Sequence, residues 1–570
     1  HILRAAELLM KMGDHDNEAK TRLAAANALR PLGRGEDSVT QASRAVEKFE
    51  LVGDQDGEAL AHEAWAQSLR SLNSFEDALA QYVLAAGLFA RTGASRREAL
   101  ALLASAQICR SIGREEESLT HFEKAVDVMR KVSNEQGEAL AEFGWGEALR
   151  DLARQDESLE HFRQAAKLFT ATNDNSGIAR VELAIAELLT SIDAKAQAVA
   201  HFTRAAENFA VAKESELEAY AEQKVADALH SLGQDQASLS HWQRSADLFA
   251  AGSDPARDAR VQLGWARSLM KCERYEDALV RLSRATEGFI ATGDLRAAIA
   301  TENTCETTLR FLGRAEESLN HVRRAAQLLS EVGDRQGEID ARVKLGKALA
   351  GMGCVDEAGL EYKQASQLAA LSDDKDLQQQ IQVGWADCFF EAKRYSESLK
   401  HYRRASSIAR KLGDEFGEAC SQERWAETLR ASGKKEASLL HYRSAIALAR
   451  SASDKAREAM AEYGFAAALS ELGRGTASVP HFRRASVIYR AYDNPSLQTW
   501  ASAGEARAEL GCAKSLLDTN RYSQSIVHYR RALKPARAIG ETLLEAPAEQ
   551  GLGEALRLAG KTQTAALHHR

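Results

Sequence analysis

Histidine residues are the first feature of this sequence that could do chemistry. Eleven of the fifteen histidines follow a forty-residue interval, with one longer step of 47 residues before the tenth: His1, His121, His161, His201, His241, His321, His401, His441, His481, His528 and His568. Imidazole rings bind metals and transfer protons. However, equivalent helices of neighbouring repeats lie roughly 8–10 Å apart, whereas zinc needs nitrogens at about 2.1 Å. We therefore predict a packing or polar-bonding role for these histidines, with no metal site and no cofactor.

Other patterns that would indicate catalysis are missing from the sequence. There is no phosphate-binding loop, no dinucleotide-binding glycine pattern, no H-E-x-x-H and no nucleophile elbow. The seven cysteines are scattered without a C-x-x-C pair, which predicts reduced thiols in an intracellular, cytoplasmic protein. The net charge of −8 includes no basic block, and no run of about 18 apolar residues occurs. We expect no enzyme activity, no nucleic-acid partner and no membrane insertion.

The forty-residue interval is an internal repeat, and each period predicts two helices. Apolar residues recur at helical spacing in residues 137–152 and again in 159–169, with a polar turn between them. Other repeats place a glycine in this turn, such as Gly33 or Gly313, which can end a helix in the left-handed conformation. Pairs such as Gly53-Asp54 supply the second turn with a helix stop and a cap for the next helix.

One face of each predicted first helix is expected to form the core. It carries a leucine column, with Leu149, Leu229, Leu309 and Leu429 among its members, and a tryptophan column formed by Trp65, Trp145, Trp265, Trp385 and Trp425. Four residues after each histidine position the second helix carries alanine in thirteen of fourteen repeats, Ser245 being the exception.

These residues resemble the tetratricopeptide repeat. In that pattern a large, a small and a leucine position in the first helix are followed by small, aromatic and alanine positions in the second. Here Trp145-Gly146-x-x-Leu149 is followed by Ser158-x-x-x-Phe162-x-x-Ala165. The terminal proline of the family is absent and the period is 40 instead of 34, which resembles the variant of Pins-type cell-polarity scaffolds. The resemblance implies an all-α fold, a right-handed α-solenoid of about fourteen helical hairpins. We expect one continuous array over residues 1–570, with truncated first and last repeats.

The resemblance implies a concave groove that binds partner segments through two columns of the first helix. We predict partner contacts by Asn27, Arg30, Gln67, Arg70, Gln107, Arg110, Glu147, Arg150, Arg310, Glu427 and Arg430. Glu147–Arg150 and Glu427–Arg430 could equally be i, i+3 pairs on a solvated surface, each worth about 0.2–0.5 kcal/mol. In the first three repeats an amide replaces the acid, which leaves the arginines available for acidic segments of a partner.

A single lengthened repeat interrupts the forty-residue interval, at about residues 494–534. Seven extra residues amount to almost two helical turns, so we expect a longer first helix beginning near Pro495 that carries Trp500 near its free end as a possible docking element. Alternatively, Trp500 folds back onto Tyr489 or Tyr492, or the helix breaks near Gly504.

We expect the chain to be a protein–protein interaction scaffold within a larger chain or assembly. One alternative is a sensor or regulatory array of a larger signalling NTPase or protease, whose catalytic domain lies outside these residues. Another is an architectural subunit of a large complex. A long surface built from stacked repeats suits all three.

Overall fold

The computed structural model describes residues 1–251, 254–372, 374–561, 564–565 and 568. Within these residues the regular secondary structure is helical, and no strand occurs. The chain forms two compact units, His1–Gly293 and Asp294–Arg570. No helix of the described part is both long and apolar enough to cross a membrane.

The helices of the first unit, including one 3-10 turn (η1), are α1 (Ile2–Met12), α2 (His15–Leu29), η1 (Arg30–Leu32), α3 (Gly35–Val52), α4 (Gln55–Ser71), α5 (Phe75–Thr92), α6 (Ser95–Ser111), α7 (Glu115–Lys131), α8 (Glu135–Asp151), α9 (Gln155–Ala171), α10 (Asn175–Ser191), α11 (Lys195–Ala212), α12 (Ser215–Ser231), α13 (Asp235–Ala251), α14 (Pro255–Lys271) and α15 (Tyr275–Ala291). Those of the second unit are α16 (Leu295–Phe311), α17 (Ala315–Val332), α18 (Arg335–Gly351), α19 (Val355–Leu371), α20 (Lys375–Glu391), α21 (Tyr395–Leu412), α22 (Glu415–Ala431), α23 (Lys435–Ser451), α24 (Lys455–Glu471), α25 (Gly475–Arg490), a second 3-10 turn η2 (Pro495–Leu497), α26 (Gln498–Asp518), α27 (Tyr522–Ala538) and α28 (Thr542–Leu558).

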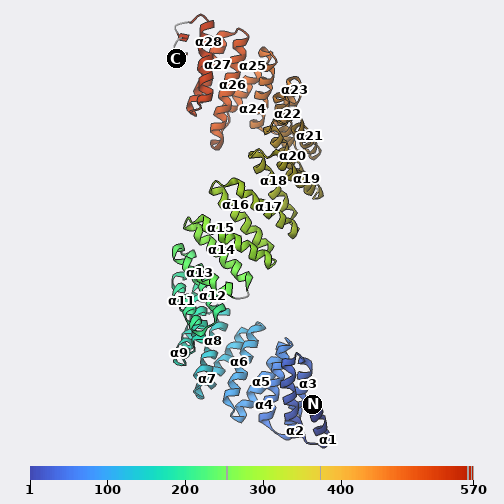
Figure 1. The fold of residues 1–570 in the computed structure, drawn as a ribbon, viewed down its shortest axis with the longest axis vertical. Helices are drawn as coiled ribbons and strands as arrows, with labels where there is room; N and C mark the ends of the chain where they lie inside the picture. Colours follow the sequence, from blue (N-terminus) through green and yellow to red (C-terminus); the bar gives the residue numbers. More distant parts are fainter. Residues whose placement is uncertain (252–253, 373, 562–563, 566–567, 569–570) are drawn as a thin grey trace. The chain divides into compact units, whose positions relative to one another are not determined.

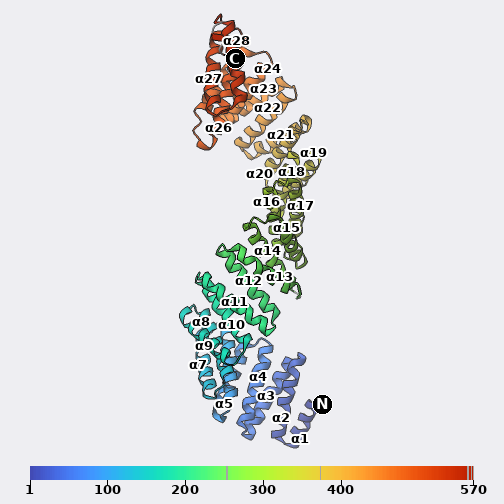
Figure 2. The ribbon, with the colours of Figure 1, turned by 60° about the vertical axis from the view of Figure 1, so that its left-hand side comes forward.

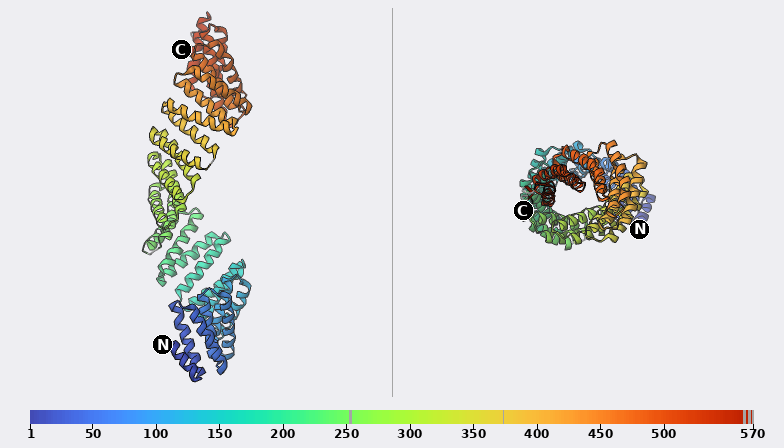
Figure 3. Two further views of the ribbon diagram at one scale, coloured as in Figure 1. Left: turned by 90° about the vertical axis from the view of Figure 1, so that its right-hand side faces the viewer. Right: turned by 90° about the horizontal axis from the view of Figure 1, so that it is seen from above.

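Even-numbered helices from α2 onward are the first helices of the repeats, and odd-numbered helices from α3 onward are the second helices. Within each unit every helix packs against the helix before it and the helix after it along the chain (Figure 1). First helices of successive repeats also touch, as α2 touches α4 and α22 touches α24. Figure 2 shows the successive packing for α20 to α22, and Figure 3 shows it for the blue helices near the N-terminus. The predicted helical repeat array is confirmed, whereas its right-handedness stays a prediction.

Short, tightly capped turns join the helices. Gly53 ends α3 in the left-handed conformation with φ 75°, and the side chain of Asp54 then accepts a hydrogen bond from the backbone N–H of Gly57, 3.0 Å away. Gly33 and Gly313 also have positive φ, as predicted for the turn inside the hairpin. The turn geometry persists without glycine, because Ala153 occupies the same position with φ 57°. The backbone path is therefore set by the repeat as a whole.

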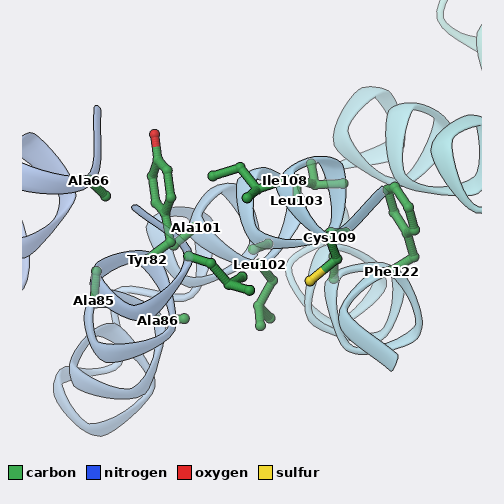
Figure 4. Close-up of a cluster of buried hydrophobic side chains, with 14 of the residues drawn as sticks. Ala66, Tyr82, Ala85, Ala86, Ala101, Leu102, Leu103, Ile108, Cys109 and Phe122 are labelled. Atoms are coloured by element: carbon green, nitrogen blue, oxygen red, sulfur yellow. The ribbon is translucent and has the colours of Figure 1, made fainter. Parts of the chain in front are cut away.

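Small residues bring the two helices of a hairpin close together. The alanines of the second-helix column are buried from Ala45 onward, and Leu149, Leu229, Leu309 and Leu429 are buried as predicted. Glycines of the first helix lie under aromatic rings of the second: a Cβ on Gly464 would come within 2.4 Å of the Tyr442 ring. Figure 4 shows a cluster of buried side chains from α4, α5, α6 and α7, in which Cys109 and Phe122 lie near aliphatic side chains.

The lengthened repeat adds its residues to a helix. Helical structure continues from Pro495 through η2 and α26 to Asp518 without a loop. Gly504 and Gly511 do not break α26, because each lies against a ring: a Cβ would come within 2.5 Å of Tyr489 and of Phe482, respectively. Trp500 does not project from the helix. Its half-buried ring packs edge-on against Tyr489 and Tyr492, with centroids 5.2 and 5.5 Å apart, as in the fold-back alternative.

The nearest-neighbour packing predicts that damage to the core stays local. Leu149→Ala removes a side chain that is 1% exposed, so we expect a loss of about 2–5 kcal/mol around α7 to α10. Hydrogen exchange measured by helix should show the loosening there, with α2 to α4 and α13 to α15 unchanged. Uniform loosening of all helices in the first unit would contradict this packing.

Candidate protein-interaction site

A polar contact links the two helices of almost every hairpin. Residues nineteen positions apart, one on the first helix and one on the second, are hydrogen-bonded at 2.5–3.4 Å in thirteen of fourteen repeats. We refer to these pairs as the ladder. They are Arg22–Gln41, His62–Gln81, Glu142–His161, Glu182–His201, Glu222–His241, Gln262–Arg281, Glu302–His321, Arg342–Glu361, Gln382–His401, Gln422–His441, Glu462–His481, Glu509–His528 and Glu549–His568.

The ladder explains the histidine column. In a representative pair the Nδ1–H of His321 donates to the carboxylate of Glu302 over 2.6 Å, and Glu302 is 1% exposed. A buried carboxylate without a donor would be costly, so the pair is stabilising as a unit. Packing and polar bonding, predicted for these histidines, both occur. The donor can also lie on the first helix, because Arg342 on a first helix donates to Glu361 on a second helix.

Tryptophans add a second contact to the same histidines. The ring of His161 stacks on Trp145 with centroids 4.0 Å apart, and His441 stacks on Trp425 at 4.1 Å. Where the histidine is replaced by Arg281, the guanidinium carbon lies 3.6 Å from the centroid of the Trp265 ring. Only Trp265 of the five column tryptophans is buried, and the others are half-buried. The tryptophan column therefore packs against the ladder residues and, at Trp65, Trp145 and Trp385, against the hydrophobic core.

One hairpin of the fourteen lacks the ladder bond. The residues at its two ladder positions are Leu102 and His121. The other thirteen hairpins have polar residues at both ladder positions. His121 is buried and its Nδ1 has no hydrogen-bond partner. Burial lowers the pKa of this imidazole.

The residues predicted to contact partners lie on the first helices, and their surroundings differ from repeat to repeat. Arg30 donates to the side-chain carbonyl of Gln67, and both line a small cavity of about 460 Å³ with Arg70 and Ser71. Arg70 is exposed. Asn27 and Gln107, which belong to the same columns, are exposed as well. Of the predicted partner-binding residues, Arg30, Gln67 and Arg70 are the ones that line a common cavity.

Arg110 differs from the sequence-based expectation, because it is neutralised. Its guanidinium lies 2.8 Å from Glu147 and 2.7 Å from Asp151, both on the first helix of the next repeat. Burial lowers the pKa of Arg110, but the hydrogen bonds that its guanidinium donates to both carboxylates outweigh burial and raise the pKa. Arg150 likewise reaches Glu187 at 3.5 Å. The sequence analysis considered only the residue three positions before each arginine. Arg110 and Arg150 also pair with acids 37 positions ahead, Glu147 and Glu187.

The remaining predicted residues are also ion-paired. Arg310 lies 3.3 Å from Glu306, and Arg430 lies 2.6 Å from both Glu427 and Glu471. The Tyr442 hydroxyl donates to Glu427 over 2.6 Å. Glu427 thus connects the two helices of its hairpin, and Arg430 connects this repeat with the next one through Glu471.

A larger groove lies between the first helices α18, α20 and α22 of the second unit. It encloses about 1070 Å³ and combines apolar and acidic side chains, among them Val343, Leu377, Ile381, Phe416, Asp376 and Asp387. Phe416 is 55% exposed at the edge of the groove. Gly384 allows the Tyr362 ring, which forms part of the wall, to pack closely, because a Cβ at this position would come within 3.2 Å of the ring.

The groove carries negative charge. Asp340, Asp376, Asp387, Glu391 and Asp414 line it, against one cation, Lys347, among the charged lining residues. The sequence analysis named none of these residues as a site. Phe416 could have been found, because the same position of the earlier repeats holds polar or small residues such as Asp56 and Asp376.

A protein-family model identifies the repeat in two regions of the chain. The tetratricopeptide repeat family model matches residues 97–171 and 377–451, which include the ladder pairs His161–Glu142 and His401–Gln382 and two helices of the groove. Both units therefore contain tetratricopeptide repeats, at residues 97–171 and 377–451. The closer resemblance to Pins-type scaffolds stays a prediction. No curated protein sequence matches the chain.

Several solved structures are similar to this chain at low identity. The apo form of RapI is 16% identical and covers 48% of this chain and 99% of its own, with a TM-score of 0.31. The apo quorum sensor NprR from B. thuringiensis is 13% identical, with 62% and 99% covered and a TM-score of 0.34. The Cut9–Hcn1 hetero-tetramer of the APC/C is 13% identical, with 95% and 94% covered and a TM-score of 0.31.

The ladder predicts different outcomes for two substitutions in one tetratricopeptide repeat. Glu302→Leu leaves Nδ1 of His321 without an acceptor, and we expect a local loss of about 1–3 kcal/mol. Glu302→Gln keeps an acceptor of the kind found naturally at Gln382 and Gln422, so most of the stability should remain. Hydrogen exchange of α16 and α17 measures both, and equal losses would contradict the ladder.

Acid should loosen the repeat around α24. Burial opposes ionisation of Glu458, but hydrogen bonds from Arg450, Lys455 and Arg484 outweigh it and lower the pKa to about 2. Because the folded pKa is depressed, this stabilisation is present above the ordinary value near 4.3 and is lost as the pH falls toward 2. We expect a pH-dependent loss of about 3 kcal/mol in the opening of α24. The loss should be absent in Glu458→Gln, and an identical pH profile in both proteins would contradict the pairing.

Proposed function

We propose that this chain is a scaffold for protein–protein interactions that holds an extended segment of a partner protein in the groove of α18, α20 and α22. The groove is the observation that supports this function most strongly. It is large enough for several side chains, it has an apolar wall, and polar groups at its rim can fix the orientation of a bound segment. The first helices that form it are held by the ladder, so the surface is pre-organised.

The lining residues indicate which segment would fit. Leu377, Ile381 and Phe416 offer contacts to an apolar anchor side chain, and the surrounding carboxylates favour lysine or arginine beside it. An aromatic or aliphatic anchor flanked by basic residues therefore matches the groove. The acidic segments expected from the arginine columns would bind elsewhere, at the cavity of Arg30 and Arg70 in the first unit.

The same groove would serve a regulatory array attached to an NTPase or a protease, or an architectural subunit of a large complex. In the first case the bound segment would control a catalytic domain outside these residues. In the second it would belong to a constant neighbour in the assembly. The proposal concerns the binding step that all of these share.

Selection of peptides from a random library on the full chain tests this function. We expect basic peptides with an apolar anchor, whose affinity falls at least tenfold, or about 1.4 kcal/mol, in Phe416→Ala. Asp376→Lys should weaken the same peptides by charge. Leu440→Ala, at a residue 69% exposed outside the groove, is the matched control and should leave binding unchanged.

The opposite results are informative as well. Peptides that bind Phe416→Ala as tightly as the wild type would overturn the groove as the site. Acidic peptides that lose affinity in Arg30→Ala with Arg70→Ala would move the site to the first unit. A library that yields no binder in either class would contradict peptide recognition itself.

A further inference from the structure

The hairpin of α6 and α7 departs from the others at two positions together. Leu102 stands where thirteen hairpins have a polar ladder residue. Cys109 stands in the leucine column, where Leu69 and Leu149 occupy the neighbouring repeats. His121 thus loses its ladder partner in the same hairpin in which a thiol appears on the facing helix. This proposal does not depend on the peptide groove, which lies in the other unit.

The three side chains converge on one point. One ligand atom each from Cys109, Glu117 and His121 lies within 4.8 Å of the other two. Glu117 and His121 are one turn apart on α7, with Oε1 of Glu117 and Nε2 of His121 4.0 Å apart. Cys109 comes from α6, where it is fully buried, while Glu117 is exposed and connects the cluster with solvent.

His121 lacks the hydrogen bond that the other ladder histidines make. The residue is 9% exposed, and its buried Nδ1 has no hydrogen-bond partner. A metal ion at this cluster would displace the proton of the Cys109 thiol.

We propose that Cys109, Glu117 and His121 form a binding site for one zinc ion. Sulfur, imidazole and carboxylate are the donors that zinc prefers, and three protein ligands leave the fourth tetrahedral position for water. On binding, the S–H bond of Cys109 breaks, the sulfur coordinates the ion and one proton passes to solvent, with no change of oxidation state. Ligand atoms within 4.8 Å need to close in by about an ångström to reach zinc bonds of about 2.0–2.3 Å.

Nearby charges are compatible with this site. Arg114 lies 3.6 Å from Glu117, but it also lies 2.8 Å from Glu76 and keeps that partner when Glu117 turns to the metal. The ion would connect α6 with α7 in the one hairpin that lacks the ladder bond. Zinc would therefore stabilise this repeat selectively.

A second group of similar composition provides an internal control. Glu50, Glu58 and His62 also bring their ligand atoms within 4.8 Å of one another. This group contains no sulfur, and Nδ1 of His62 is already bonded to Gln81 over 2.7 Å. We expect no tight site there.

Zinc titration of the full chain against a chromophoric chelator tests the proposal, with Co²⁺ as a spectroscopic probe. We expect one tight equivalent, release of a proton on binding, and a thiolate-to-cobalt absorption band. Cys109→Ser and His121→Gln should each weaken zinc at least tenfold and Cys109→Ser should abolish the band. Cys305→Ser, at another buried thiol, and His62→Gln should change neither the zinc affinity nor the cobalt band.

Hydrogen exchange locates the effect without relying on affinity. Zinc should slow exchange in α6 and α7 of the wild type and not in Cys109→Ser. If Cys109→Ser is unfolded, as circular dichroism would show, Glu117→Gln on the exposed side replaces it, with the same expected loss. Absence of tight zinc binding, or zinc binding and protection that persist in these variants, would overturn the site.

Discussion

The hydrogen bond between the two helices, present in thirteen of the fourteen hairpins, is the interaction on which most of the structure depends. The interfaces are lined by alanine, leucine and glycine, and apolar contacts of this kind have no preferred direction. A helix that slid by one turn would still bury apolar surface. It would, however, leave a buried carboxylate or imidazole unpaired, as with Glu302 and His321, and that cost exceeds the net gain from a single hydrogen bond. The ladder therefore sets the register.

The register in turn determines what the first helices present on their other face. One column of that face holds Lys347, Asp387 and Glu427 in successive repeats. The hydroxyl groups of Tyr402 and Tyr442 donate to Asp387 and Glu427, which ties these acids to the second helices. Tyr362 has Lys347 at the corresponding position, and the groove opens beside its ring. The groove thus lies where a lysine takes the place of the acid that accepts from the tyrosine hydroxyl in the next two repeats.

Much of this architecture could be predicted because its signals are local. The left-handed turn at Gly53, the cap by Asp54 and the burial of Leu149 each depend on residues within a few positions. The partners of His321 and Arg110 lie 19 residues back and 37 residues ahead, so they depend on how helices pair and on how repeats stack. The groove was missed for the same reason, since its walls come from three helices forty residues apart. The half-burial of Trp500 likewise required the positions of Tyr489 and Tyr492.

Exchange of the two partners in one ladder pair tests the role of the ladder most directly. Glu222 and His241 suit this experiment, because they lie 2.6 Å apart and no tryptophan stacks on this histidine. Glu222→His, His241→Glu and the double variant complete a thermodynamic cycle, read by hydrogen exchange of α12 and α13. Each single change should destabilise the hairpin, and the double variant should recover most of the loss, with a coupling of about 1 kcal/mol or more. Additive losses, with no recovery in the double variant, would show that the ladder does not set the register.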